Sequence, residues 1–128
     1  MKNEITMATI KSFSDLPQSK KLAEILPLES ADMFYVAGKG EPIFIGNKMV
    51  ACGDDDYDAL GGPDVLCWSL AALIEVLPSI EGFKPVIDLD INLIRYEGNY
   101  RDELCFNGNN LIDACYEMII KLHELNLL

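Results

Sequence analysis

The sequence predicts an α+β fold, and three observations carry this prediction. Apolar residues recur with helical spacing at 15–26, 65–77 and 110–125, and a capping residue or a proline bounds each segment. Short runs of β-branched and aromatic residues lie between these segments. Half of the 128 residues are apolar, which supplies a hydrophobic core without disulfides or metals. We expect one domain over residues 1–128, with 1–13 as a loose lead-in or an edge strand.

The first helix is predicted over residues 15–26. Asp15 can accept hydrogen bonds from the free amides of the first turn, and Gln18 stands at the capping-box position. Pro17 is tolerated in a first turn, whereas Pro27 ends the helix because proline cannot continue it.

Short strands are predicted after this helix, at 33–37, 42–45 and 48–52. A Gly-Asn tight turn separates the last two of them. An acidic, glycine-rich loop at 53–64 then leads into the second helix.

The second helix is predicted over residues 65–77, with Asp64 as its cap and Pro78 as its stop. Only Ser69 and Glu75 are strongly polar in this segment. A helix that is apolar almost all round is typical of a buried position. We therefore expect this helix at the centre of the fold.

Residues 85–96 alternate between apolar and polar side chains, which predicts one strand with a solvated face. A turn at 97–99 and a return strand at 100–106 follow, and Asn110 caps a last helix over 110–125. The predicted order is therefore α-β-β-(β)-α-β-β-α, with one mainly antiparallel sheet and a buried central helix. Strands split into two small layers are the alternative.

The last helix carries two apolar stripes. The core-facing stripe consists of Leu111, Cys115, Met118, Leu122 and Leu125. The second stripe exceeds what one core requires, so it is either packed under another element or a contact surface. Its residues are our interface candidates: Tyr116, Ile120, His123 and Leu127.

The charge balance limits the partners of the chain. The formal net charge is −11, from 21 acidic and 10 basic residues. Such a surface repels phosphate, because nucleic-acid affinity comes mostly from Lys and Arg. We expect no direct binding to nucleic acid or membranes, which leaves another protein or a second copy as partner. One alternative is that the acidic surface mimics nucleic acid and occupies a basic site on another protein.

The sequence also indicates a cytoplasmic protein. The N-terminal residues lack an apolar signal-peptide segment, and the longest apolar stretch is shorter than the roughly 18 residues of a membrane span. The four cysteines form no C-x-x-C pair, which favours reduced thiols. Cys67 and Cys115 lie in apolar stretches and are expected to be small core residues.

Two acidic clusters raise the alternative of a metal-dependent hydrolase or small-ligand binder, because hard cations need several converging carboxylates. The candidate ligands are Asp54, Asp55, Asp56, Asp58, Asp88 and Asp90. Neither cluster fits the calcium-loop pattern, since Ala59 and Leu93 stand where glycine is required. An exposed acidic loop is the simpler interpretation.

No catalytic motif supports an enzyme. The single histidine, His123, has apolar stripe neighbours, and Ser69 lacks the G-x-S-x-G elbow. The glycine pairs do not complete a nucleotide or phosphate-loop fingerprint. We therefore expect no cofactor and favour a non-enzymatic protein.

Two segments carry a family resemblance: C-W-S-L-A-A-L-I-E-V-L-P at 67–78 and I-D-A-C-Y-E-M-I-I-K-L at 112–122. With the strands between them, they resemble small proteins of unknown function from gut bacteria and their prophages or other mobile elements. This resemblance implies no activity and no site residues. It does imply an accessory role, since accessory proteins of mobile elements often bind another protein. The leading hypothesis is thus a non-enzymatic accessory or protein-interaction domain.

Overall fold

The computed structural model describes residues 11–35, 42–44 and 65–128. The chain divides into two compact units. The first unit is Phe13–Ala72, and the second combines Leu73–Leu128 with the residues before Phe13. The prediction of a single domain over the whole chain stays a prediction.

The first unit begins with α2 (Leu16–Ile25), and its bounds and caps confirm the helix predicted over 15–26. Asp15 Oδ1 accepts a hydrogen bond from the Gln18 amide at 2.9 Å, and Gln18 Oε1 accepts one from the Asp15 amide at 3.1 Å. This reciprocal pair is the predicted capping box, which satisfies two amides that the helix leaves free. The short 3-10 helix η1 (Leu28–Ser30) follows.

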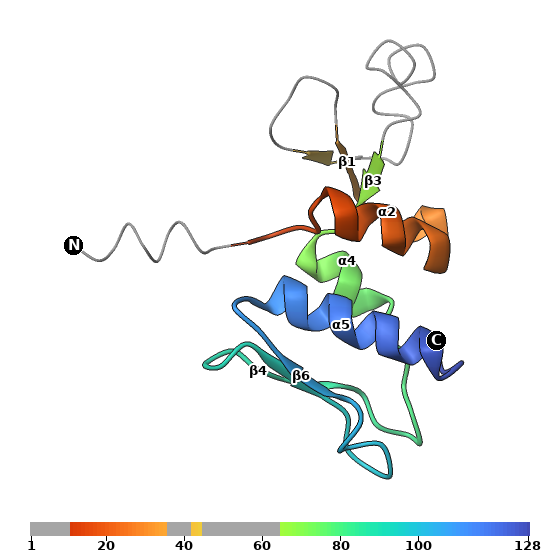
Figure 1. Cartoon of the computed structure of the whole chain (residues 1–128), viewed down its shortest axis with the longest axis vertical. Coiled ribbons are helices and arrows are strands. Elements are labelled where there is room, and N and C mark those ends of the chain that lie inside the picture. The colour runs from red at the N-terminus through yellow and green to blue at the C-terminus, as the bar shows by residue number, and fades with distance from the viewer. Residues whose placement is uncertain (1–10, 36–41, 45–64) are drawn as a thin grey trace, which may run out of the picture. The chain divides into compact units, whose positions relative to one another are not determined.

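The described part of the first unit contains an antiparallel sheet of β1 (Met33–Tyr35), β2 (Ile43–Phe44) and β3 (Val65–Cys67). Their order is β2-β1-β3, so β1 lies in the middle (Figure 1). The predicted strand at 48–52 and the acidic loop at 53–64 fall outside the described residues.

The helix predicted over 65–77 begins later than expected. Its first three residues are β3, because pairing with β1 satisfies their backbone groups in an extended form. The helix itself is α4 (Leu70–Glu75), and the Ser69 hydroxyl caps it by accepting the Ala72 amide at 3.2 Å. One side of α4 is buried at Leu73, whereas Glu75 is exposed, so the helix is buried on one face only.

Buried hydrogen bonds hold the first unit together. Ser14 exchanges bonds with Trp68, since the Ser14 amide donates to the Trp68 carbonyl at 2.9 Å and Ser14 Oγ accepts the Trp68 amide at 3.1 Å. The Trp68 ring is fully buried, and its Nε1–H donates to Ser30 Oγ at 2.9 Å. The Tyr35 hydroxyl donates to the Ser14 carbonyl at 2.6 Å. Trp68 therefore anchors the core without an unpaired polar atom on its ring.

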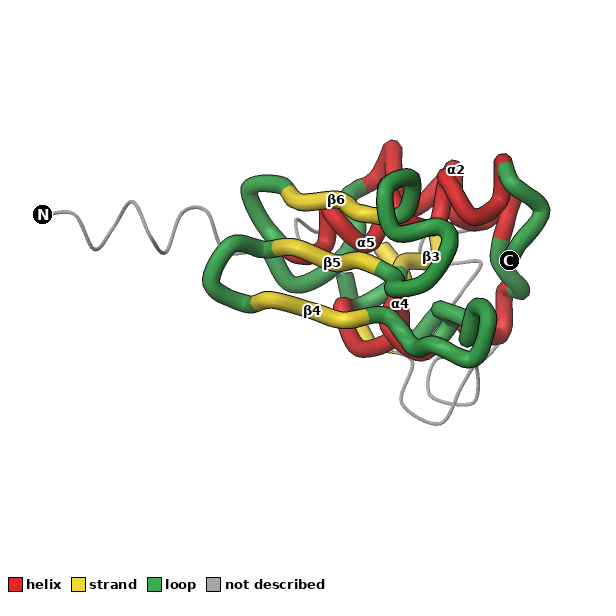
Figure 2. Tube along the Cα trace, turned by 90° about the horizontal axis from the view of Figure 1, so that it is seen from below, coloured by secondary structure: helices red, strands yellow, loops and turns green. Residues whose placement is uncertain are grey.

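The second unit contains an antiparallel sheet in the order β4-β5-β6, covered on one face by α5 (Leu111–Glu124). The strands are β4 (Val86–Asp88), β5 (Leu93–Arg95) and β6 (Cys105–Asn107). Figure 2 shows them side by side, with β4 at one edge. The middle residues of the strands, Ile87, Ile94 and Phe106, share one face, and Ile94 is fully buried.

The prediction of a single strand over 85–96 is wrong, because the chain reverses direction between Asp88 and Leu93. Asn92 has a φ of 50°, and the Asp88 carboxylate accepts the Asp90 amide at 3.0 Å. These are turn-forming interactions of Asn and Asp, and they make β4 and β5 a hairpin. The return strand predicted over 100–106 is shorter and corresponds to β6.

The α+β class with antiparallel sheets is confirmed. The described strands are divided between two three-stranded sheets, so the prediction of one sheet is wrong for this part of the chain. Over the described residues, the helices and strands follow in the order α-β-β-β-α-β-β-β-α, with one strand more in the second half than expected. Among the described residues, no helix is long and apolar enough to cross a bilayer.

Candidate functional site

An open hollow of about 440 Å³ lies on the second unit beside α5. We call it the α5 groove. It is lined by Asp102, Glu103, Cys105, Phe106, Glu117, Ile120, Lys121 and Glu124. Half of these side chains are carboxylates, and two are large and apolar.

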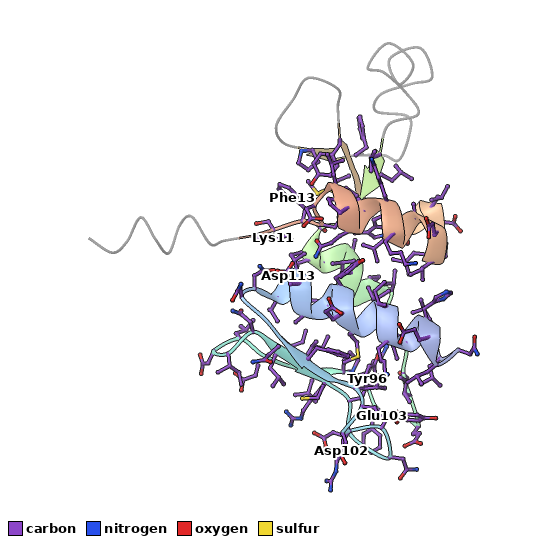
Figure 3. The ribbon with its side chains drawn as sticks, viewed as in Figure 1. Lys11, Phe13, Tyr96, Asp102, Glu103 and Asp113 are labelled. Carbon is purple, nitrogen blue, oxygen red and sulfur yellow. The ribbon has the colours of Figure 1, made fainter. Side chains whose placement is uncertain are left out.

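One wall of the groove is a single face of α5. Helical spacing brings four residues to neighbouring positions on this face: Glu117, Ile120, Lys121 and Glu124. The helix starts at Asn110, whose Oδ1 accepts the Asp113 amide at 2.8 Å as predicted. Lys11 Nζ also lies 2.8 Å from Asp113 Oδ1 and connects the segment before the first unit to this end of α5 (Figure 3).

The other wall consists of the first two residues of β6, Cys105 and Phe106, and of the turn between β5 and β6, where Figure 3 places Asp102 and Glu103. Tyr96 closes this turn from inside the core, because its amide donates to the Leu104 carbonyl at 2.9 Å. The fully buried Tyr96 hydroxyl donates to the Pro78 carbonyl at 2.7 Å, and burial raises the pKa of Tyr96 to about 12. The turn is thus fixed at its base.

A second support holds the start of the same turn. Glu81 Oε1 accepts the Asn99 amide at 3.0 Å, and Glu81 Oε2 accepts the Asn99 side-chain amide at 3.1 Å. Gly98, just before Asn99, has a φ of 93°, which favours glycine. Asp102 and Glu103 are therefore carried by a turn whose backbone is defined.

The groove carries an excess of negative charge, with four carboxylates and the ammonium group of Lys121. Within the described ranges, ion pairs join Lys11 to Asp113, Lys21 to Glu24 and Arg95 to Glu97, and none includes a groove carboxylate. A groove of this charge attracts Lys and Arg side chains of another molecule.

The structure brings only one of the four interface candidates into the groove. Ile120 lines it, whereas Tyr116 and Leu127 are half-buried and His123 is exposed outside it. The predicted core stripe is buried at Leu111, Cys115, Met118 and Leu122, and Leu125 is half-buried. Ile112, Ala114 and Ile119 are buried as well, so the buried face of α5 is wider than the predicted stripe, and the contact role of the second stripe stays a prediction.

Sequence reasoning missed most of the groove. The sequence spacing places three charged residues around Ile120 on one helix face: Glu117, Lys121 and Glu124. This spacing could have predicted an apolar residue surrounded by charged side chains. Asp102 and Glu103 gave no such signal, because only the tertiary fold brings the β5–β6 turn to α5.

The metal candidates are not brought together in the described part of the chain. Asp54, Asp55, Asp56 and Asp58 fall outside it. Asp88 and Asp90 are exposed on the β4–β5 hairpin, where Asp88 Oδ1 accepts the Asp90 amide at 3.0 Å. Among the described residues, no group of three His, Cys, Asp or Glu side chains could hold a metal ion. A metal site in the acidic loop stays a prediction.

The described cysteines differ in their surroundings. Cys67 and Cys115 are fully buried, as predicted, and burial raises the pKa of each thiol to about 11. Cys105 is exposed and lines the α5 groove. Because the thiolate is the reactive form, the two buried thiols are poor nucleophiles at neutral pH.

Comparisons with family models, with curated proteins and with solved structures find no match to this chain. The resemblance of 67–78 and 112–122 to small proteins of gut bacteria and mobile elements stays a prediction. Within the described residues, the α5 groove combines exposed apolar residues with an excess of carboxylates, and the functional proposal below starts from it.

Proposed function

We propose that this chain is a non-enzymatic accessory protein that binds another protein through the α5 groove. The observation that carries the proposal is the position of Ile120, an apolar side chain of the surplus stripe, inside an open groove framed by four carboxylates. Protein interfaces commonly place an apolar anchor within a polar rim.

The groove specifies the chemistry of the partner. Ile120 and Phe106 offer apolar surface, and burying one apolar side chain contributes about 1.5–3 kcal/mol. Asp102, Glu103 and the α5 carboxylates favour Lys or Arg around that contact. The expected partner therefore presents an apolar side chain flanked by basic residues.

The test is capture from native cell extract by the tagged full chain, with bound proteins quantified by mass spectrometry. Ile120→Asp places a further carboxylate at the centre of the groove. We expect at least a tenfold loss of one stoichiometric partner, because a difference of 1.4 kcal/mol already changes an equilibrium constant tenfold. Circular dichroism is expected to show that this variant stays folded, since Ile120 is only half-buried.

Leu28→Asp is the matched control. Leu28 is 54% exposed on η1 of the first unit, so the same type of substitution leaves the groove unchanged. We expect it to retain the partner. A folded Ile120→Asp variant that captures the same proteins as the wild type would contradict the proposal, and so would its unfolding, which would make Ile120 a core residue.

Charge reversal at the groove rim tests whether the carboxylates contribute to partner binding, and it leaves the apolar residues of the groove unchanged. Glu117 is exposed, so Glu117→Lys is expected to leave the fold intact and to weaken capture several-fold. Capture that survives high salt points to the apolar contact. Capture that is lost steeply with salt instead favours the alternative of an acidic nucleic-acid mimic.

A further inference from the structure

The α5 groove lies beside one edge of the sheet of the second unit. In the order β4-β5-β6, β6 pairs with β5 on one side, and no described strand pairs with its other side (Figure 2). Two of the three residues of β6, Cys105 and Phe106, line the groove, and no residue of β4 or β5 does. The hollow is therefore on the β6 side of the sheet, where a further strand would lie about 4.8 Å from β6.

The hydrogen-bond register shows which backbone groups of β6 face this edge. The Tyr96 amide donates to the Leu104 carbonyl at 2.9 Å, so Leu104 bonds inward to the β5 side. In an antiparallel ladder the bonding direction alternates along each strand. Phe106 therefore bonds inward as well, whereas the amides and carbonyls of Cys105 and Asn107 point outward. Both residues are exposed, so the edge presents backbone groups that can pair with another chain.

The apolar residues of the groove determine one side chain of such a strand. A residue opposite Phe106 places its side chain on the same face of the sheet as Phe106. This is the face that α5 covers, and Ile120 of α5 lines the groove together with Phe106. Both side chains are only half-buried. An apolar side chain opposite Phe106 therefore gains contact with two apolar neighbours.

The carboxylates of the groove determine the following positions. In antiparallel pairing, the residue two places after the one opposite Phe106 lies opposite Leu104. It is thus directed towards the turn that carries Asp102 and Glu103 (Figure 3). Both carboxylates are exposed, and the groove contains two more against one ammonium group. Lys or Arg at this position and at the next one on the same face complements that charge.

We propose that the partner binds the α5 groove as an extended segment that adds an antiparallel strand to β6. This inference rests on the proposed function and names the occupant of the groove. The segment has an apolar residue opposite Phe106 and Lys or Arg two and four residues later. The residues before and after the apolar one pair through their backbones with Asn107 and Cys105. Main-chain bonds then provide affinity, and the alternate side chains provide specificity.

The first test is the affinity of the full chain for a synthetic peptide, measured by isothermal titration calorimetry. The peptide is threonine-leucine-threonine-lysine-threonine-lysine, acetylated and amidated at its ends. The matched control has the same residues in reverse order, which keeps its charge but directs both lysines away from Asp102 and Glu103. We expect the reversed peptide to bind at least tenfold more weakly. Equal affinity of the two peptides overturns the proposal, and so does the absence of binding by both.

Methylation of peptide amides tests the main-chain bonds without changing a side chain. The amides of the two threonines that flank leucine face β6, so methylating both removes both donors to this edge. We expect at least a tenfold loss of affinity. The amides of leucine and of the first lysine point away from β6, so methylating these two is expected to retain binding. Equal effects of the two pairs of methyl groups contradict strand pairing.

A substitution in β6 tests the same bonds from the side of the protein. Asn107→Pro removes one outward amide, and proline is tolerated at edge-strand positions whose amide takes no part in the ladder. Circular dichroism is therefore expected to show a folded variant, with at least a tenfold loss of peptide affinity. Asn107→Ala keeps the amide and is expected to bind like the wild type. A folded Asn107→Pro variant with unchanged affinity contradicts the proposal.

Hydrogen exchange locates the bound peptide. We expect saturating peptide to protect the amides of Cys105 and Asn107, whereas the Phe106 amide, which bonds to β5, is an unchanged reference. Peptide binding without this protection overturns the added strand. Protection that rises with protein concentration alone, without peptide, overturns it too, because a second copy would then occupy the edge. Partner capture with Ile120→Asp uses no peptide, so failure of the added strand and failure of the proposed function are distinguishable.

Discussion

The turn that carries one wall of the α5 groove depends on Gly98, and replacing this glycine tests the described geometry. Gly98 has a φ of 93°, a conformation in which an L side chain is strained by roughly 1–2 kcal/mol. A Cβ at this position lies 2.6 Å from Glu81 Oε1 and 3.3 Å from Phe83 Cε2. Gly98→Ala therefore forces the Glu81 carboxylate away from Asn99.

The loss of stability in Gly98→Ala follows from the backbone strain and from the displacement of the Glu81 carboxylate. Each of the two hydrogen bonds from Asn99 to Glu81 contributes roughly 0.5–1.5 kcal/mol, at the low end here because the pair is exposed. Together with the backbone strain, Gly98→Ala is expected to lower the free energy of unfolding by about 2–4 kcal/mol. Urea unfolding followed by circular dichroism measures this loss.

Two other glycines of the same unit separate the contributions. Gly82 has a φ of 85° but no atom within 4 Å of an added Cβ, so Gly82→Ala is expected to cost the backbone strain alone, about 1–2 kcal/mol. Gly108 has ordinary backbone, and its nearest neighbour, Asp113 Cβ, lies 3.6 Å from an added Cβ, so Gly108→Ala is expected to change stability by less than about 0.5 kcal/mol.

A double-mutant cycle completes this test. In a Glu81→Ala background the contact with Glu81 disappears and the looser contact with Phe83 Cε2 at 3.3 Å remains, so the cost of Gly98→Ala is expected to fall close to that of Gly82→Ala. Equal losses for Gly98→Ala and Gly82→Ala in the wild-type background would contradict this prediction, because the contact with Glu81 would then contribute nothing.

Two further predictions concern the core of the same unit. Burial raises the pKa of Tyr96 to about 12 and of Cys115 to about 11, above the values of 10 and 9 of the free groups. The folded state favours the neutral form of each group, so the free energy of unfolding is highest below about pH 9. It falls as the pH rises towards 12, by roughly 2–3 kcal/mol per group. Urea unfolding at pH 8 and pH 11 measures the loss, and equal free energies would contradict it. Asn110→Ala removes the cap of α5 and is expected to cost about 1 kcal/mol in the same assay, whereas an unchanged midpoint would show that the cap is dispensable.

The elements that the sequence predicted well are those with local signals at both ends. Asp15 and Gln18 marked the start of α2, Asn110 marked that of α5, and helical spacing identified the buried stripe of α5. The strands were harder, because their pairing is non-local. A short apolar run is compatible with a helix or a buried strand, and residues 65–67 became β3 through pairing with β1.

The alternation of apolar and polar residues led to a wrong prediction at the β4–β5 hairpin. Leu89 and Ile91 continue the apolar positions of a strand, yet both are exposed in the turn. The left-handed Asn92 and the bond from the Asp90 amide to Asp88 decide the local backbone there. For the groove, Ile120 was foreseeable from its helix face, whereas Asp102 and Glu103 were not, since long-range packing alone brings their turn to α5.

The alkylation rate of the Cys105 thiol tests the proposed binding at the α5 groove most directly. Cys105 is exposed in the groove, and the buried Cys67 and Cys115, whose pKa values are raised to about 11, serve as slow internal references. The rate is read by mass spectrometry of the cysteine peptides, with the protein isolated and in its captured complex. We predict that the complex protects Cys105 and that Ile120→Asp abolishes this protection. A Cys105 rate that is the same in the complex and in the isolated protein would contradict binding at the groove.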